Sequence, residues 1–241
     1  MKQRIVIFVA AALVAGLAGF FALQPSDQTA ATPTAPVPPA AVAPPPDLEA
    51  LKTKAAAGDP AAQTRLGWIC QKGTGMKPDM KAAVNWFRQA AEQNYPEALV
   101  ALGEMTQAGQ GTKPDPTEAA RLYRLAAEKS SVAGQYDLAY LYEQGSGVEK
   151  SETEAAKWYE LAASGGDPIA QYDIGQRYLL GVGVSTNLPQ ACKWLTLAAG
   201  QGQADSTRLL RDLKSQLSAA ELAQANQLLK EFVPRATNVL H

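Results

Sequence analysis

The chain has 241 residues, with 22 basic and 23 acidic side chains and a formal net charge of −1. This balance gives no electrostatic basis for binding nucleic acid or acidic membranes, because both attract clustered positive charge. The single histidine is the last residue, and the sequence has no histidine, cysteine and carboxylate cluster suited to a metal. We therefore expect no metal site and no cofactor.

Residues 1–24 form an apolar N-terminal segment. Lys2 and Arg4 precede 19 uncharged residues, Ile5 to Leu23, and a helix of that length spans about 28 Å, close to the thickness of a hydrocarbon core. The length of this segment favours an uncleaved signal-anchor. Gly16-Leu17-Ala18 is a small-x-small site at which a peptidase could cut, so a cleaved signal peptide is the alternative. The positive charges should remain cytoplasmic. We therefore expect a periplasm-facing bacterial protein anchored in the inner membrane, or a free periplasmic one after cleavage.

Residues 25–46 consist mostly of alanine, proline and threonine, with Asp27 as their one charge. Such a segment cannot bury enough apolar surface to fold, and its prolines favour polyproline II. We interpret it as a disordered, semi-rigid spacer between the membrane and a folded domain.

A 36-residue unit then recurs four times without a gap, at about 60–94, 96–130, 132–166 and 168–202. Equivalent positions of the four units carry similar residues, and we call each such set a column. The first half of the unit has two columns and the second half has three: Leu66, Leu102, Leu138 and Ile174; Gly67, Gly103, Ala139 and Gly175; Ala83, Ala119, Ala155 and Ala191; Trp86, Leu122, Trp158 and Trp194; and the alanine pairs that start at 90, 126, 162 and 198. Apolar spacing of i, i+3, i+4 within each half predicts two helices. A helical hairpin repeated at this period predicts an all-α solenoid.

Turn and cap signals separate the helices. A Gly-x-Gly follows each first helix, starting at 73, 109, 145 and 181; it could cradle phosphate, but its position between two helices favours glycines with positive φ that turn the chain. Ser151 and Glu154 predict a capping box. The small residues of the first-helix column should let helices approach closely, and we expect the tryptophans of the second helix in the core.

Both ends of the repeat array carry caps. Asp47 precedes a lone helix, Leu48 to Ala57, which we interpret as a half-repeat over 47–58. After the repeats, a helix over 204–217 and a second one starting with a Ser218–Glu221 capping box form a capping pair over 204–233. The remaining residues, 234–241, are expected to be a loose tail.

The repeat resembles the Sel-one-like repeat family, within the tetratricopeptide-repeat-like superfamily. The pattern A-x-x-x-L-G-x-x-Y-x-x-G-x-G-V, followed by a K-A-x-x-W helix ending in A-A, matches nearly every position from Ala170 through Ala199, and the likeness covers about 48–204. Cys70 and Thr106 stand in the tyrosine column of the earlier repeats, and Met76 and Thr112 in the valine column. The resemblance implies a protein-interaction scaffold that binds a partner in a concave groove. It also suggests two roles, a regulator of a sensor kinase or an assembly factor of an envelope machine.

By resemblance to tetratricopeptide repeats, first helices line the concave side and present a stripe of residues to the partner. Val100, Gln107 and Leu179 belong to this stripe, and Tyr136 and Tyr172 have an alternative role in packing. The candidate partner-binding residues are Trp68, Gln71, Glu104, Tyr136, Tyr140, Glu143, Tyr172 and Gln176.

Other functions receive less support. The aromatic groove could bind peptidoglycan or another glycan. A cell-wall or β-lactam-hydrolysing enzyme is disfavoured, because the sequence lacks G-x-S-x-G and S-x-x-K, and it lacks the two cysteines per repeat of the family branch for which penicillin binding is proposed. Cys70 and Cys192 lie three repeats apart, too far for a disulfide, so we expect two buried free thiols.

Overall fold

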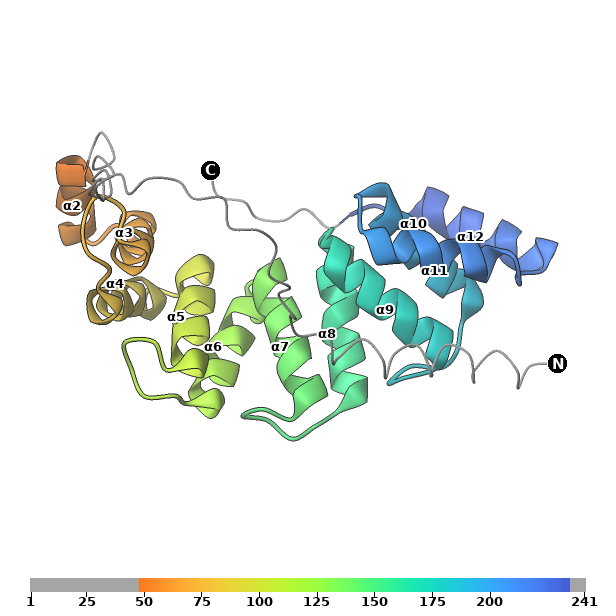
Figure 1. Ribbon diagram of the computed structural model, residues 1–241, viewed down its shortest axis with the longest axis horizontal. Coiled ribbons are helices and arrows are strands. Elements are labelled where there is room, and N and C mark those ends of the chain that lie inside the picture. Colours follow the sequence, from red (N-terminus) through yellow and green to blue (C-terminus); the bar gives the residue numbers. More distant parts are fainter. Residues whose placement is uncertain (1–47, 235–241) are drawn as a thin grey trace, which may run out of the picture. The chain divides into compact units, whose positions relative to one another are not determined.

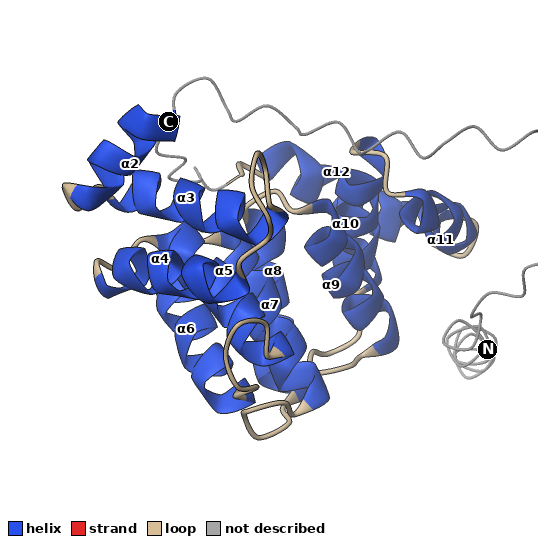
Figure 2. Ribbon diagram, turned by 60° about the vertical axis from the view of Figure 1, so that its left-hand side comes forward, coloured by secondary structure: helices blue, strands red, loops and turns tan. Residues whose placement is uncertain are grey.

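The computed structural model describes residues 48–234, which contain eleven α-helices and no strand (Figures 1 and 2). The helices are α2 (Leu48–Ala56), α3 (Pro60–Lys72), α4 (Met80–Glu92), α5 (Pro96–Ala108), α6 (Pro116–Glu128), α7 (Val132–Gln144), α8 (Glu152–Ser164), α9 (Pro168–Leu180), α10 (Leu188–Gly200), α11 (Ala204–Lys214) and α12 (Ala219–Glu231).

Four helical hairpins follow one another along the chain: α3 with α4, α5 with α6, α7 with α8, and α9 with α10. The second helix of each hairpin also packs against the first helix of the next, so the succession visible in Figure 1 is a stack of neighbours. The predicted all-α solenoid is confirmed.

The predicted signal or transmembrane segment, the spacer and nearly all of the predicted tail lie outside the described residues. Between residues 48 and 234, no helix is both long enough and apolar enough to cross a membrane. Asp47, the predicted cap of the first helix, also lies outside this range.

Local signals position the helix ends much as expected. Each first helix ends at a glycine with left-handed backbone, as at Gly145 with φ of 70°. Ser151 caps α8 by accepting from the backbone N–H of Glu154 at 3.2 Å. The predicted return bond from Glu154 does not form, because its carboxylate pairs with Lys157 at 2.8 Å. Among the described helices, the full capping box forms only at the start of α12, between Ser218 and Glu221.

The small first-helix column lies directly beneath the large side chains of the hairpin's second helix. A Cβ added to Gly67 would lie 2.5 Å from the Phe87 ring, and one added to Gly103 would lie 2.6 Å from the Tyr123 ring. The expected close approach of the helices is therefore confirmed. These large side chains form a column one residue after the tryptophan column. Its members are Phe87, Tyr123, Tyr159 and Leu195, all of them buried.

The expectation that all three tryptophans lie in the core is wrong for two of them. Trp86 and Trp158 are only partly buried, and they pack against the core clusters from outside. Trp194 is 1% exposed. The Phe232 ring, which follows α12, packs edge-to-face on Trp194 at 5.4 Å between centroids. Of the three tryptophans in this column, Trp194 is therefore the one that is fully buried, and Leu122 of the same column is buried as well.

The second glycine of each Gly-x-Gly joins neighbouring repeats. Gly147 has φ of 70°, and a Cβ there would overlap the backbone carbonyl of Pro116, the first residue of α6 in the preceding repeat. Gly111 and Gly183 meet the starts of α4 and α8 in the same way. These glycines therefore set the spacing between repeats as well as the turn within one.

Buried glutamines form a second link between helices, and the sequence analysis missed them. Gln63, Gln135 and Gln171 each donate a side-chain N–H to the carbonyl eight residues earlier, at 3.1 to 3.3 Å. Each of these carbonyls lies in the last turn of the preceding helix and also accepts from the backbone N–H three residues further on, at 2.9 to 3.1 Å. The glutamine therefore adds a second bond to a helix end. The recurrence of glutamine in this column was a usable signal.

At the two ends, α2 packs on α3, while α11 and α12 both pack on α10. α2 ends at Ala56 and α11 at Lys214, against the expected 57 and 217. Cys70 and Cys192 are buried free thiols, as predicted. Burial raises the pKa of both.

Candidate functional site

The first helices of the hairpins lie close to one another. α3 contacts α5 and α5 contacts α7, whereas the second helices of these hairpins make no comparable contacts with each other. This spacing is that of the inner side of a curved stack. We call the exposed surface of α3, α5, α7 and α9 the first-helix face; the eight predicted partner-binding residues belong to these four helices.

Trp68 and Glu104 line one small cavity on the first-helix face. The cavity has a volume of about 180 Å³ and includes Val100, Glu97 and Ala133, so it spans α3, α5 and the start of α7. Trp68 is 39% exposed and Val100 is buried. An exposed indole beside a carboxylate and an apolar floor can contact the stem and the charge of a long basic side chain.

The three predicted tyrosines differ in whether their side chains are exposed or already contact other residues of the protein. Tyr140 is 45% exposed, and its ring is available to a partner. The Tyr136 ring packs edge-to-face on Tyr159, with centroids 5.3 Å apart. Tyr172 accepts a hydrogen bond from the Gln176 side-chain amide at 2.6 Å. Tyr136 and Tyr172 therefore also have a structural role, the alternative that the sequence analysis left open.

Glu143 is held in an internal network. Its carboxylate accepts from the Tyr159 hydroxyl at 2.8 Å and from the Arg177 guanidinium at 2.6 Å. Arg177 is buried, donates also to Glu152 at 2.8 Å, and lies over the Tyr159 ring. The remaining members of this part of the stripe, Gln71, Gln107 and Leu179, are half-buried, and Gln107 accepts from the Tyr123 hydroxyl.

Two carboxylates on the first-helix face were missed by the sequence analysis. Asp137 and Asp173 are half-buried and directly follow Tyr136 and Tyr172. Burial, together with the negative charges of Glu104 and Asp167, raises the pKa of Asp137 to about 7. Burial also raises the pKa of Asp173 to about 6, although a hydrogen bond from Tyr136 and the charge of Arg177 act in the opposite direction. The repeated Tyr-Asp pair was the available signal.

Ionisation of Asp137 should make stability depend on pH. Its folded pKa of about 7 exceeds the ordinary value of about 3.9, so stability should fall as pH rises from about 4 to about 7. We expect Asp137→Asn to raise the free energy of unfolding by about 1 kcal/mol or more at pH 8, and to have little effect at pH 4. Urea denaturation at the two pH values measures this.

The control for this prediction is Asp212→Asn, which changes an exposed carboxylate paired with Arg211 on α11. It should leave the pH dependence of the wild type unchanged. An Asp137→Asn variant with the same pH dependence as the wild type would contradict the assignment of the raised pKa.

Comparison with known proteins places this geometry among repeat proteins. A family model described as "Sel1 repeat" matches residues 60–95, 96–131, 132–167 and 168–203. A Sel1 repeat protein from Oxalobacter formigenes is similar in structure, with a TM-score of 0.66 and 30% sequence identity, over 75% of this chain and 78% of that chain. The resemblance inferred from the repeat pattern is confirmed.

A second similar structure is a protective antigen present in uropathogenic Escherichia coli strains, described as displaying an SLR fold. Its TM-score is 0.50 and its identity 25%, over 79% of this chain and 49% of that chain. A search of curated proteins finds no match. Within residues 48–234, no three histidine, cysteine or carboxylate side chains are grouped so that they could hold a metal ion.

Proposed function

Because the chain belongs to the Sel1 repeat family, whose fold is a scaffold for protein–protein interaction, we propose that it is a non-enzymatic adaptor whose first-helix face binds a protein partner. The observation that carries the proposal is the pair of exposed aromatic side chains, Trp68 and Tyr140, on a face that also bears Glu104, Asp137 and Asp173. Exposed aromatic residues are the side chains on which binding energy concentrates.

The chemistry of this face indicates a basic partner segment. Lysine or arginine side chains could lay their stems on Trp68 and Tyr140 and reach Glu104 or Asp137 with their charges. Such a segment would lower the pKa of Asp137 on binding, because a nearby positive charge favours the ionised carboxylate. Affinity should therefore rise between pH 6 and pH 8 and fall with added salt.

We place the adaptor at the periplasmic side of the inner membrane, on the basis of the N-terminal sequence. In that location it would regulate a sensor kinase or assist the assembly of an envelope machine. Both roles need the same property, which is a rigid surface that holds one partner without changing it chemically.

Site-specific photocrosslinking tests the proposal. A photoreactive residue at position 140 should capture a partner in cells, whereas the same residue at exposed position 88, on α4, should not. The double change Trp68→Ala and Tyr140→Ala should weaken binding of the captured partner at least about tenfold, since two aromatic anchors are removed. An unchanged affinity of the double variant for the captured partner would contradict the proposal.

A glycan ligand is the second candidate, because exposed aromatic rings such as Trp68 and Tyr140 can also stack on sugar rings. Co-sedimentation of the purified protein with peptidoglycan sacculi separates the two ideas. An adaptor for proteins should stay in the supernatant, and a glycan-binding protein should pellet in a manner that depends on Trp68.

A further inference from the structure

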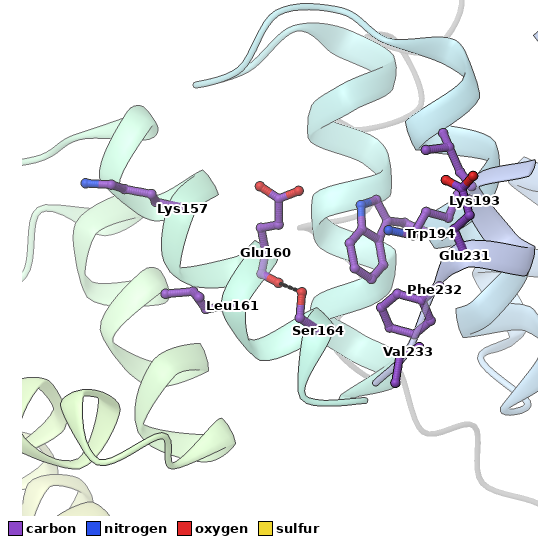
Figure 3. A pocket seen from close by; sticks show the side chains of 10 residues that line it. Lys157, Glu160, Leu161, Ser164, Lys193, Trp194, Glu231, Phe232 and Val233 are labelled. Atoms are coloured by element: carbon purple, nitrogen blue, oxygen red, sulfur yellow. Dashed lines mark hydrogen bonds between the residues drawn. The ribbon is translucent and has the colours of Figure 1, made fainter. Parts of the chain in front are cut away.

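A second cavity lies away from the first-helix face, between α8, α10 and the end of α12 (Figure 3). Its volume is about 690 Å³, within the range of small-ligand pockets. Lys157, Glu160 and Leu161 of α8 form one wall. The other wall consists of Lys193 and Trp194 of α10 and of Phe232, which follows α12. Leu228 and Val233 add apolar surface.

Two hydrogen-bond donors of this cavity lack an acceptor. Trp194 is 1% exposed, and its indole N–H has no hydrogen-bond partner among the described residues. A buried donor of this kind normally has a partner, so an orphaned one needs an explanation. The cavity supplies one, because Trp194 forms part of its lining and a ligand atom in the cavity could accept the bond.

Lys193 is the second donor. Its ammonium lies 3.8 Å from the centroid of the Trp194 ring and 4.7 Å from that of Phe232. Within residues 48–234 no carboxylate lies within ion-pair distance of it. Burial lowers the pKa of Lys193, and the charge of Glu160 opposes this effect. The aromatic rings therefore hold a positive charge at the cavity wall without neutralising it.

Each of the other charged side chains in the cavity has at least one partner within the protein. Glu160 accepts from the Tyr178 hydroxyl at 2.9 Å, and Glu231 accepts from Gln227 at 2.6 Å. Lys157 pairs with Glu154 at 2.8 Å. The groups left without partners are thus an indole N–H and an ammonium, and both favour a carboxylate as the ligand group.

We propose that this cavity is a second binding site, which takes the free carboxy terminus of an apolar peptide. The carboxylate would contact Lys193 and the Trp194 N–H, and the last apolar side chains would pack against Leu161, Leu228 and Val233. The site is independent of the first-helix face, so the protein could hold two different partner segments at once.

The indole N–H signals of the four tryptophans provide the test. The full-length protein, labelled with ¹⁵N at its indoles, is titrated with acetyl-Ala-Val-Leu as the free acid, as the carboxamide, and with acetyl-Ala-Lys-Leu-amide. Trp194→Phe assigns the Trp194 signal. We expect the acid to shift this signal and to bind at least about tenfold more tightly than the carboxamide.

Lys193→Met should abolish the preference for the acid over the carboxamide. The matched control, Lys157→Met, removes a cation from the same cavity that already has a carboxylate partner, and it should keep the preference. The proposal is overturned if acid and carboxamide bind equally, if the lysine peptide binds more tightly than the acid, or if the Trp194 signal does not move with any of the three. These wild-type outcomes decide the question even if a variant fails to fold.

Discussion

Gly147→Ala should lower the free energy of unfolding by about 3 kcal/mol. Gly147 has φ of 70°, where a Cβ is disfavoured, and the added methyl would overlap the backbone carbonyl of Pro116. A backbone carbonyl in the first turn of α6 cannot move without shifting the helix. The repeat that contains Gly147 would therefore have to move away from the repeat before it. Urea denaturation followed by far-UV circular dichroism measures the loss.

Gly166→Ala is the matched control. Gly166 has φ of 97°, and a Cβ there would meet nothing within 4 Å. In this variant the free energy of unfolding should fall by only about 1 kcal/mol, the cost of placing a Cβ on a residue with positive φ. Equal losses for the two variants would mean that Gly147 serves the turn alone and that the contact between repeats is not tight. A broader unfolding transition in Gly147→Ala is also expected, because repeats couple only through their neighbours.

Arg177→Met should lower the free energy of unfolding by about 2–3 kcal/mol at pH 7. Arg177 is buried and binds Glu143 at 2.6 Å and Glu152 at 2.8 Å, so it joins α9 to α7 and to the start of α8. Methionine fills a similar volume but leaves Glu143 and Glu152 without their charge partner. The expected loss is below that of a fully buried ion pair, because each carboxylate is about one-third exposed.

The same change should make the free energy of unfolding depend less on pH under acidic conditions. Burial opposes ionisation of Glu152, but hydrogen bonds from Arg177 and Lys150 outweigh it, so the pKa of Glu152 lies below its usual value. Its contribution is present above the unfolded pKa of about 4.3 and is lost as pH falls through the folded pKa. Arg177→Met should therefore lose less stability than the wild type between pH 5 and pH 3.

Arg121→Met is the control for Arg177→Met. Arg121 binds Glu118 at 2.7 Å on the surface of α6, and its side chain is 59% exposed. Exposed pairs of this kind contribute about 0–1 kcal/mol. A loss for Arg121→Met as large as that for Arg177→Met would show that the network between α7 and α9 is no stronger than a surface ion pair.

The sequence was informative about this fold where signals act over a few residues. The apolar period predicted each helix, and the caps and glycines set most helix ends to within one to three residues. The sequence was less informative about which side chains of a helix point into the core. Phe87 and Trp86 both belong to one wide apolar stripe, and nothing local decides that Phe87 packs under Gly67 while Trp86 is left at the edge.

The candidate site shows the same division. Trp68 and Tyr140 were predicted by resemblance to tetratricopeptide repeats, and their exposure agrees with surface positions. Asp137 was missed because an aspartate in a helix is normally solvated, and its raised pKa depends on burial by neighbouring helices and on charges such as Glu104, 33 residues away. Glu143 was predicted as a partner-binding residue, but its position next to Arg177 of the following repeat gives it an internal partner.

By itself, the sequence determined that this protein is a stack of helical hairpins, because period, caps and positive-φ glycines each act within one repeat. Only the tertiary structure decided which charges meet and which donors remain unpaired. The Glu143–Arg177–Glu152 network and the cavity at Trp194 both form between helices whose contacting residues lie 25 or more positions apart in sequence. Burial and electrostatic coupling depend on distance in space, and α12 creates the second cavity only by folding back onto α10.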